Sequence, residues 1–513
     1  MTDCSTRPIR FVHQGQIQQV EGLPPTTTVL QWLREQAHCT ATKEGCAEGD
    51  CGACTVVVAE TDPATGTLQR RTVNACIQFL PTLDGKALFT VEDVNAQAAQ
   101  QIGPHALHPC QEAMVACHGS QCGFCTPGFV MSLWHHYEQH EAPSTRTELA
   151  DALSGNLCRC TGYRPILDAG QRMHEAPRVT LDTAPVQAQL AQIDAQADGA
   201  LCYEGPNAQH PGLTQRFHAP TTLDELATLR EALPRARLLA GSTDIGLWVN
   251  KQFKDLGDII YVGRVHALQG IHIAVQQGVL EIGAGASLEA AWSALARHLP
   301  ALREIWLRFA SPPVRHAGTM GGNVANGSPI GDSAPILLAL GASLVLRKGS
   351  HTRELPLSAF YLDYMKNDLQ PGEFLQSIRV PLPGPDDTQG ERLRAYKLSK
   401  RRDSDISALC AGLYLRLEGE LIREARLGWG GMAATARRAT QTEAALIGQP
   451  WNEATLRRAQ AALAQDFSPL TDLRASADYR RKAAANLLER FWLETRLHQP
   501  LRADAVQVWP ATA

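Results

Sequence analysis

The sequence lacks a strong charge of either sign and lacks any long apolar run. Its net charge is −4, from 48 Lys and Arg against 52 Asp and Glu, which gives no electrostatic basis for binding nucleic acid or an anionic membrane. No stretch of about 20 apolar residues is present, so no segment is predicted to span a bilayer. Residues 1–5 do not begin the apolar core of a secretory signal, and the chain is expected in the cytoplasm.

Two further absences bear on the fold. No good copy of the G-x-G-x-x-G pattern is present, so a Rossmann dinucleotide domain is not predicted. No internal repeat is evident either. With 513 residues, of which an ordinary 44% are hydrophobic, the chain is too long for one core and predicts three or more domains.

Cysteine, by contrast, is plentiful, with 14 residues. Eight of them fall into two arrays within the first third of the chain, and their spacings are typical of metal sites. In a cytosolic chain of this size, metal ligation by thiolates is favoured over disulfides. The other six are expected to be ordinary buried or surface residues: Cys4, Cys39, Cys110, Cys117, Cys202 and Cys410.

The first array has the spacing C-x4-C-x2-C, with a fourth cysteine further along the chain. Its members are Cys46, Cys51, Cys54 and Cys76. This spacing is the plant-type ferredoxin pattern for a 2Fe–2S cluster. Glycines between and beside these cysteines allow a tight loop whose backbone N–H groups point at sulfur. A structural zinc site is the alternative, but zinc ribbons usually pair two C-x2-C knuckles, which the x4 gap fits poorly.

The second array reads C-x2-C followed later by C-x-C. Its members are Cys122, Cys125, Cys158 and Cys160. Taken alone, this pattern fits zinc as well as iron–sulfur, whereas beside a ferredoxin loop it indicates a second 2Fe–2S cluster. Arg159 lies between two of the ligands, and its positive charge is expected to raise the potential of an anionic cluster. Two adjacent one-electron centres predict a protein that transfers single electrons.

The order of these patterns predicts an α+β multidomain protein. Residues 1–90 predict a small ferredoxin-like 2Fe–2S domain, and residues 91–175 predict a helical domain that carries the second array. Residues 176–212 are rich in Ala, Gln, Pro, Asp and Gly, and predict a linker that runs over the surface. Residues 213–388 mix strands and helices, and residues 389–513 begin with strands and end in helices.

Two glycine-rich segments, 239–246 and 318–332, have the small residues and backbone donors that can hold a pyrophosphate. Taken alone, each segment is more often an ordinary turn, and Phe309 just before the second is either a ring-stacking residue or core. The pair His135 and His136 has no carboxylate or third histidine in register. It is therefore interpreted as part of a helix surface and not as a metal site.

Taken together, these motifs resemble the molybdenum hydroxylase family. Its two iron–sulfur domains are similar to residues 45–54 with Cys76, and to residues 121–128 with residues 158–163. Its FAD domain is similar to the loops near residues 241 and 322. Within the family, the order iron–sulfur, iron–sulfur, FAD on one chain is similar to that of the small subunits of bacterial xanthine dehydrogenases.

The resemblance covers residues 7–497 except the linker, and it implies a specific fold for each domain. These folds are a plant-ferredoxin-like β-grasp domain, an all-α 2Fe–2S domain, an FAD-binding domain of the vanillyl-alcohol-oxidase or CO-dehydrogenase-flavoprotein type, and a C-terminal α+β flavoprotein domain. The FAD-binding domain corresponds to residues 213–388 and the C-terminal domain to residues 389–513.

The resemblance also implies roles for individual residues. The first array ligates the solvent-side cluster and the second the cluster nearer molybdenum, with Gln121 and Cys160 close to the pterin. FAD is held by Leu239, Ala240, Gly241, Ser242, Thr243, Asp244, Ile245, Gly246, Phe309, Thr319, Gly321, Gly322, Asn323, Ser328, Asp332 and Lys397. Access of NAD+ involves Tyr364, Lys366, Arg402 and Asp405. Where the family often has two successive acidic residues, Ser404 breaks the pair.

The activity implied is electron transfer within a xanthine dehydrogenase. A partner subunit that carries molybdopterin oxidises hypoxanthine to xanthine and urate, two 2Fe–2S clusters pass the electrons singly, and FAD collects them and reduces NAD+. The chain is expected to lack hydroxylation activity by itself and to form a heterotetramer with two copies of each subunit. The alternatives are O2 as acceptor, another molybdenum hydroxylase acting on an aldehyde, CO or an N-heterocycle, a diaphorase, and a zinc-bound scaffold.

Overall fold

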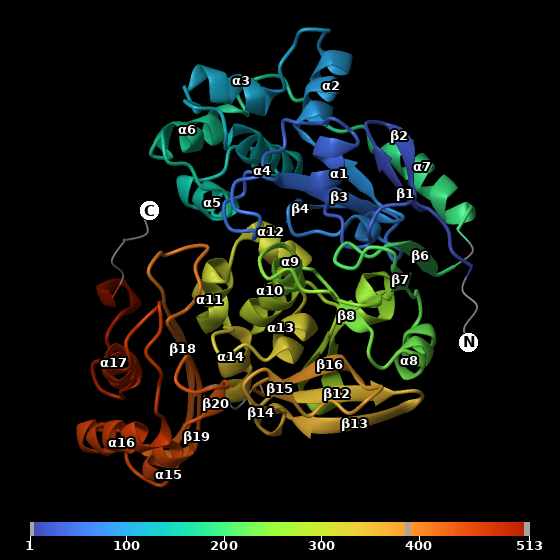
Figure 1. The fold of residues 1–513 in the computed structure, drawn as a ribbon. Helices are drawn as coiled ribbons and strands as arrows, with labels where there is room; N and C mark the ends of the chain where they lie inside the picture. Colours follow the sequence, from blue (N-terminus) through green and yellow to red (C-terminus); the bar gives the residue numbers. More distant parts are fainter. Residues whose placement is uncertain (1–4, 198, 385–389, 507–513) are drawn as a thin grey trace. The chain divides into compact units, whose positions relative to one another are not determined.

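A computed structural model describes residues 5–197, 199–384 and 390–506. The chain divides into two units, of which the first is Met1–His266 with Ala310–Gly318 and the second is Ala267–Phe309 with Thr319–Ala513. Figure 1 shows the elements of both units and labels most of them. Each unit combines sheets and helices, so the predicted α+β multidomain class is confirmed.

The first unit begins with a five-stranded sheet in the order β2-β1-β5-β3-β4. The strands are β1 (Ile9–His13), β2 (Gln16–Val20), β3 (Thr55–Thr61), β4 (Leu68–Asn74) and β5 (Ala87–Phe89). β1 and β2 form the antiparallel hairpin that the sequence predicts, and β1 pairs with β5 in parallel. Helix α1 (Val29–Glu35) begins at a Thr28 capping box and buries its apolar face in the core beneath this sheet. This arrangement is the predicted ferredoxin-like domain.

A group of helices follows the sheet. Its members are α2 (Val91–Gln101), α3 (Pro109–Ala116), α4 (Thr126–Gln139), α5 (Arg146–Ala152) and α6 (Arg164–Arg172). Helix α4 has Pro127 in its first turn and is buried over most of its length. The prediction that His135 and His136 lie on a helix surface is wrong, because these side chains are only 8% and 6% exposed. Helix α4 is central in this domain, so both sides of it are covered.

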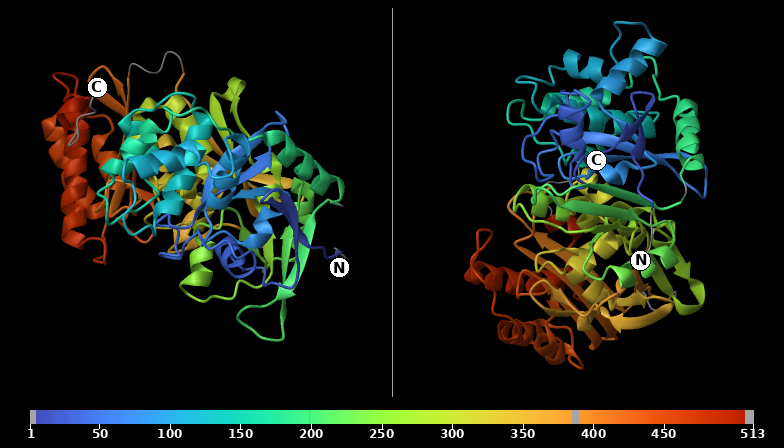
Figure 2. Two further views of the ribbon diagram at one scale, coloured as in Figure 1. Left: turned by 90° about the horizontal axis from the view of Figure 1, so that it is seen from above. Right: turned by 45° about the vertical axis from the view of Figure 1, so that its right-hand side comes forward.

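Residues 176–212, which the composition predicts to be a linker over the surface, form regular secondary structure. They contain helix α7 (Thr183–Ala195) and the whole of strand β6 (Leu201–Pro206). Val186, Leu190 and Ile193 recur at helical spacing, and they join the apolar core that β1 and α4 share. Figures 1 and 2 show α7 beside the β1–β2 hairpin. The sequence did not predict this helix, because its three spaced apolar residues lie among many Ala and Gln residues and give only a weak helical pattern.

The first unit ends with a four-stranded sheet in the order β6-β7-β9-β8. The further strands are β7 (Thr214–Ala219), β8 (Arg237–Leu239) and β9 (Ile259–Tyr261), and the helices are α8 (Leu223–Ala232), α9 (Ile245–Asn250) and α12 (Pro312–Ala317). Strands β7 and β8 both pair with β9 in parallel, and the loop after β8 leads along the chain into helix α9. Helix α12 comes from much later in the sequence and packs on β4.

The second unit contains a five-stranded sheet in the order β10-β11-β16-β12-β13. Its strands are β10 (Ile271–Ala274), β11 (Val279–Gly283), β12 (Ser343–Lys348), β13 (His351–Pro356) and β16 (Phe374–Pro381). The helices are α10 (Leu288–His298), α11 (Arg303–Arg308), α13 (Met320–Asn326) and α14 (Ser333–Leu340), and a small hairpin joins β14 (Tyr361–Asp363) to β15 (Lys366–Asn367).

The C-terminal part of the second unit is an antiparallel sheet covered by helices. The strands are β17 (Glu391–Leu398), β18 (Leu409–Glu418), β19 (Leu421–Gly430) and β20 (Arg437–Arg438), and the helices are α15 (Thr440–Leu446), α16 (Glu453–Asp466) and α17 (Ala477–Thr495). Apolar residues of these helices and strands share one core, as the strand-then-helix pattern of the sequence predicts. Among the described residues, no helix has both the length and the apolar character needed to cross a membrane.

Candidate functional site

The first cysteine array lies in the loop between α1 and β3, with its fourth member after β4. The Sγ atom of Cys46 accepts the backbone N–H of Cys51 at 3.4 Å, and its thiol interacts with those of Cys51 and Cys76. Cys54 is fully buried and pairs with the thiol of Cys76. Thiols that meet in pairs are the donor set that a 2Fe–2S cluster requires, with two cysteines on each iron.

The surroundings of this array favour thiolate sulfur. Hydrogen bonds from the Cys51 and Cys76 thiols, together with backbone N–H groups, hold the pKa of Cys46 well below its usual range. The pKa of Cys54 is also lowered, first by the thiol of Cys76. Among the described residues, no three His, Cys, Asp or Glu side chains converge on one metal ion. The fit to a cluster therefore rests on the paired thiols and their donors.

The second array lies in the two loops that lead into α4 and into α6. The thiol of Cys122 interacts with that of Cys160, and the thiol of Cys125 with that of Cys158. Burial acts to raise the pKa of Cys158, but donors from Thr161 lower it, with the hydroxyl at 3.2 Å from Sγ and the N–H at 3.5 Å. Burial raises the pKa of Cys125 to about 12. This pairing again matches the requirement of a 2Fe–2S cluster, and two of the predicted ligands, Cys122 and Cys160, are exposed.

The two arrays are joined by direct contacts within the first unit. The N–H of Leu157, next to the predicted ligand Cys158, donates to the carbonyl of Cys51 at 2.9 Å. The side chain of Asn156 donates to the carbonyl of Gly52 at 3.1 Å. A Cβ atom at Gly52 would lie 2.1 Å from the carbonyl oxygen of Gly155, so only glycine permits this approach. The arrangement brings the two predicted clusters close together.

The predicted FAD segment 239–246 is held against the first array. The hydroxyl of Ser242 donates to the carbonyl of Ile77 at 2.6 Å, and the amide of Asn250 donates to the carbonyls of Cys76 at 2.7 Å and Ala47 at 3.2 Å. A Cβ atom at Gly246 would lie 2.6 Å from the carbonyl oxygen of Ile77. These residues recur every four positions and so lie on one face of α9 and the turn before it.

The same segment has backbone donors that remain available. The N–H groups of Ser242, Thr243 and Ile245 donate to no group among the described residues. Ser242 has a φ of +61°, and such a left-handed residue directs successive N–H groups toward one side. A run of backbone donors of this kind fits the pyrophosphate of FAD. The hydroxyl of Ser242, however, is bound to the carbonyl of Ile77, and Gly246 has no side chain, so any contact these two residues make with the cofactor is through the backbone.

The second predicted FAD segment lies in the second unit. Thr319 caps α13, and its hydroxyl accepts the N–H of Gly322 at 3.0 Å. Asp332 and Lys397 are both buried and form an ion pair at 2.7 Å, and the hydroxyl of Ser407 donates to the other carboxylate oxygen at 2.5 Å. Each of the two charged groups therefore has a partner within the protein, and with Ser407 they form a buried polar cluster.

The remaining residues of this segment lie around the start of α13. The backbone of Gly321 approaches Ala284, and a Cβ atom at this glycine would lie 2.4 Å from that of Ala284. Asn323 donates its N–H to the Thr319 carbonyl at 3.0 Å, and the hydroxyl of Ser328 accepts the N–H of Ile330 at 3.4 Å. Phe309 is 6% exposed and packs against Trp292 with ring centroids 5.8 Å apart. The structure thus gives Phe309 a core contact, while its contact with a flavin stays a prediction.

The predicted NAD+ residues fall in two places in the second unit. Tyr364, which is 65% exposed, and Lys366 lie at the tip of the β14–β15 hairpin. This hairpin is tied to α13 because Tyr361 donates to the carbonyl of Val324 at 3.0 Å and Asn367 donates to that of Ala325 at 2.7 Å. The other two residues, Arg402 and Asp405, lie in the loop after β17. The role of all four residues in binding NAD+ stays a prediction.

That second loop is held by hydrogen bonds. The carboxylate of Asp405 accepts the N–H of Arg401 at 2.8 Å; burial acts to raise its pKa, but this bond and that from the N–H of Ile406 lower it. The carbonyl of Arg402 accepts a bond from the guanidinium of Arg308 at 3.2 Å. Sequence reasoning missed Arg308 as it missed Asn250, since neither lies in a recognisable motif.

Comparison with protein families divides the chain into four known domains. Residues 11–79 match a 2Fe-2S iron-sulfur cluster binding domain, and residues 90–171 match a second 2Fe-2S binding domain. Residues 213–383 match the FAD binding domain in molybdopterin dehydrogenase, and residues 394–495 match the CO dehydrogenase flavoprotein C-terminal domain. The chain has the iron–sulfur and FAD architecture of the molybdenum hydroxylase family. The predicted resemblance to this family is therefore confirmed.

Individual members of the molybdenum hydroxylase family support this assignment. A xanthine dehydrogenase of Emericella nidulans is 32% identical over 94% of this chain and 38% of its own length. Aldehyde oxidase 4 of Cavia porcellus is 28% identical over 95% of this chain and 39% of its own length. The chain thus spans less than half the length of these relatives. A carbon monoxide dehydrogenase of Hydrogenophaga pseudoflava, 28% identical, aligns with a TM-score of 0.50 over 53% of this chain and 94% of its own.

Proposed function

We propose that this chain is the electron-transfer subunit of a xanthine dehydrogenase. In this role, electrons from the oxidation of hypoxanthine and xanthine at a molybdenum centre on a partner subunit reach NAD+ by way of two 2Fe–2S clusters and FAD. The single observation that carries the proposal is the direct hydrogen bond from Leu157 to Cys51, which joins the loops of the two cysteine arrays. Electron transfer by iron–sulfur and FAD domains is common to the molybdenum hydroxylases.

When bound, the clusters and the flavin supply one-electron and two-electron redox chemistry. The residues of this chain hold and orient these groups. Backbone N–H groups and the Thr161 hydroxyl donate to cysteine sulfur, which stabilises negative charge at each cluster. Asn250 and Ser242 attach the proposed flavin segment to the backbone around the ligand Cys76. The hairpin that carries Tyr364 would orient NAD+.

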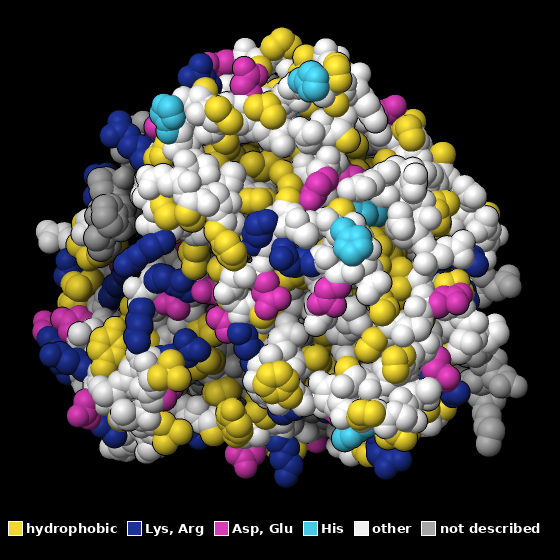
Figure 3. All heavy atoms as spheres, turned by 45° about the horizontal axis from the view of Figure 1, so that its top comes forward, with side chains coloured by type: hydrophobic (Ala, Val, Ile, Leu, Met, Phe, Trp, Pro, Cys, Tyr) yellow, Lys and Arg dark blue, Asp and Glu magenta, His cyan; other side chains and the backbone are white. Residues whose placement is uncertain are grey.

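The partner is proposed to dock on the helical domain. The ligands Cys122 and Cys160 are exposed there, beside Phe124 at 46% and Tyr163 at 39% exposure. Figure 3 shows apolar side chains at the surface in the upper part of its view, where this domain lies. Exposed apolar residues around a redox centre are suited to an interface that a second protein covers. The quaternary structure would then be a heterotetramer with two copies of each subunit.

The substrate assignment has competitors within the same family. The relatives include both xanthine dehydrogenases and an aldehyde oxidase, and the C-terminal domain model is named after CO dehydrogenase. The identity with the xanthine dehydrogenase of Emericella nidulans is 32%, against 28% for the aldehyde oxidase, and this difference favours purine oxidation. An aldehyde, CO or an N-heterocycle remains the alternative substrate, and O2 the alternative acceptor.

An optical spectrum of the chain purified with its natural partners tests the proposal. Flavin and iron–sulfur bands should bleach when hypoxanthine is added under nitrogen and return when NAD+ follows. Bleaching by an aldehyde but not by hypoxanthine would show that an aldehyde, and not a purine, is the substrate. A spectrum without iron–sulfur bands would reject the electron-transfer role. Cys54→Ala should remove one cluster signal from the electron paramagnetic resonance spectrum, whereas the control Cys117→Ala should retain both.

A further inference from the structure

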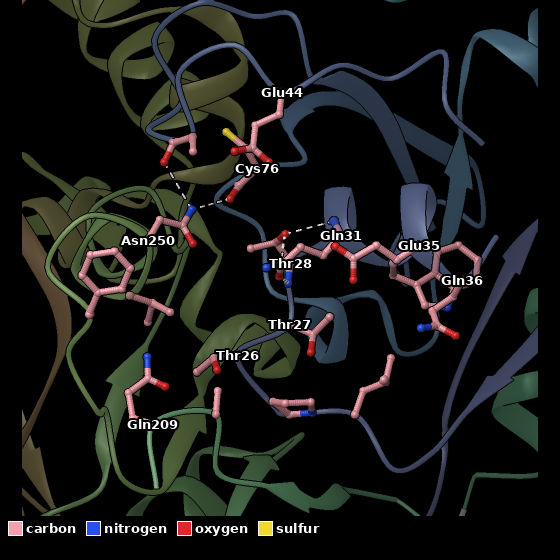
Figure 4. Close-up of a pocket in the computed structure, with 17 residues that line it drawn as sticks. Thr26, Thr27, Thr28, Gln31, Glu35, Gln36, Glu44, Cys76, Gln209 and Asn250 are labelled. Atoms are coloured by element: carbon pink, nitrogen blue, oxygen red, sulfur yellow. Dashed lines mark hydrogen bonds between the residues drawn. The ribbon is translucent and has the colours of Figure 1, made fainter. Parts of the chain in front are cut away.

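A cavity of about 670 Å³ lies in the first unit beside the first cysteine array. Figure 4 shows its lining, with Asn250 and Gln209 on one side and Glu35 and Gln36 on the other. Cys76 reaches the cavity, so a molecule bound there would contact a ligand of the proposed solvent-side cluster. A volume in this range is typical of sites for small organic molecules.

Several polar side chains of the lining have no protein partner. Within the described part of the chain, the side chains of Thr27, Glu35, Gln36, Glu44 and Gln209 make no hydrogen bond. By contrast, the amide nitrogen of Asn250 is held by the carbonyls of Cys76 and Ala47, which fixes this side chain at the cavity wall. Polar groups that line a cavity without partners are available to a ligand.

The charge and the aromatic residues of the cavity indicate the class of ligand. Glu35 and Glu44 are carboxylates, and none of the described residues that line the cavity is Lys, Arg or His. Trp32 and Phe253 add aromatic rings, and Phe253 is 76% exposed. Carboxylates attract cations, and aromatic faces bind flat rings and quaternary ammonium groups. The lining therefore suits a planar organic cation.

We propose that this cavity binds a planar organic cation of the bipyridinium class, which exchanges single electrons with the solvent-side cluster. The inference rests on the proposed function, because that function places the cluster at Cys46, Cys51, Cys54 and Cys76. In each exchange the bound cation loses one electron and the cluster gains one, or the reverse. No bond is made or broken, and no proton moves. Electrons could then enter or leave the protein at this site without passing through the flavin.

Binding is tested with methyl viologen on the holoprotein with its partners. The oxidised dication does not reduce the oxidised protein, so equilibrium dialysis measures binding alone. We expect one saturable site for each copy of this chain. Glu35→Gln with Glu44→Gln should weaken binding about tenfold or more, because two carboxylates are lost near the cation. The control Glu112→Gln with Glu141→Gln changes the net charge equally at exposed residues outside the cavity and should leave the affinity unchanged.

Two comparisons sharpen this experiment. Sulfonatopropyl viologen has the same rings but no net charge, and it should bind about tenfold or more weakly than methyl viologen. Phe253→Ser should also weaken binding. Because Phe253 is exposed, this substitution should leave the fold intact, and a normal cluster spectrum checks that it does. Equal affinity in the wild type and the Glu35/Glu44 variant, or no saturable binding to fully clustered protein, overturns the proposal.

Electron exchange is tested by stopped-flow mixing of the oxidised holoprotein with the viologen radical cation. The bleaching rate of the cluster band should saturate with dye concentration in the wild type and fall about tenfold in the Glu35/Glu44 variant at subsaturating dye. A linear rate that is equal in both proteins overturns the proposal. Iron–sulfur bands in the starting spectrum show that the clusters are present. Their absence would reject the proposed function itself, so the two failures are distinguishable.

Discussion

The side-chain amide of Asn250 donates to the carbonyl oxygen of Cys76 at 2.7 Å. The same nitrogen donates to the carbonyl of Ala47, which lies next to another cysteine of the array. Asn250 ends helix α9, and this helix follows the proposed flavin segment directly. A single side chain thus connects the loop of the first proposed cluster to the helix that carries the flavin segment.

The first prediction concerns this connection. Asn250→Leu removes two hydrogen bonds, each worth about 1 kcal/mol, and leaves both carbonyls beside an apolar side chain. We expect the first cluster to lose iron to a chelator faster and its electron paramagnetic resonance signal to change, while the signal of the second cluster stays the same. Asn95→Leu, at an exposed position of α2, is the control. Equal changes in both cluster signals would contradict a local role of Asn250.

A second prediction follows from the close approach of α9 to Ile77. Gly246→Ala would place a Cβ atom 2.6 Å from the Ile77 carbonyl oxygen, so the helix or the cluster loop must shift. Overpacking of this kind costs about 1 to 3 kcal/mol. We expect a lower melting temperature and a lower FAD content in the purified protein. Gly270→Ala serves as the control, since nothing lies within 4 Å of that Cβ position. The same loss in both variants would rule out the proposed clash.

The buried pair of Lys397 and Asp332 gives a third prediction. Lys397→Met leaves the carboxylate of Asp332 buried without its cation, which costs about 3 to 5 kcal/mol. Adding Asp332→Asn removes the unpaired charge and should restore much of the stability in denaturant unfolding. Arg457→Met breaks an exposed ion pair with Glu453 and should cost at most about 1 kcal/mol. A double variant no more stable than Lys397→Met would show that charge pairing does not explain the loss.

The fourth prediction concerns two buried histidines of the first unit, His135 and His316, whose rings lie 5.5 Å apart. Burial lowers the pKa of each to about 3. The ring of His316 lowers the pKa of His135 further, and the guanidinium of Arg315 lowers that of His316 further. Both pKa values lie below the unfolded value of about 6.5, so the unfolded chain binds more protons as the pH falls. Their contribution to stability is therefore complete above about pH 6.5 and is lost progressively toward pH 3.

Denaturant unfolding at pH 7 and pH 5 measures this loss. Each histidine should contribute about 2 kcal/mol of acid destabilisation over this interval, because its protonation is favoured only in the unfolded chain. His316→Gln should therefore lose less stability between the two pH values than the wild type, although its stability at pH 7 is also reduced. The control is His105→Gln, at an exposed position of the helical domain, which should keep the wild-type dependence. An unchanged dependence in His316→Gln would refute the prediction.

Local patterns predicted much of the fold. The β1–β2 hairpin, helix α1 and the strand-then-helix order of the C-terminal part depend on turns, caps and apolar periodicity that a short stretch of sequence contains. Helix α7 was missed because three spaced apolar residues among Ala and Gln give only a weak helical pattern. The packing of this helix on β1, which the pattern does not reveal, is what buries its apolar face. His135 was misassigned for a related reason. Whether a helix face is buried depends on which elements pack against it.

The sequence by itself determined which cofactor-binding domains this protein contains, because the cysteine spacings occur within stretches that match two 2Fe-2S binding domains. It also determined the family, since four domain patterns occur in a characteristic order. Only the tertiary structure decided how the two arrays meet, through Leu157 and Cys51, and how α9 is attached to Cys76. These contacts join residues separated by about a hundred positions or more, and no local pattern encodes a distance between such segments.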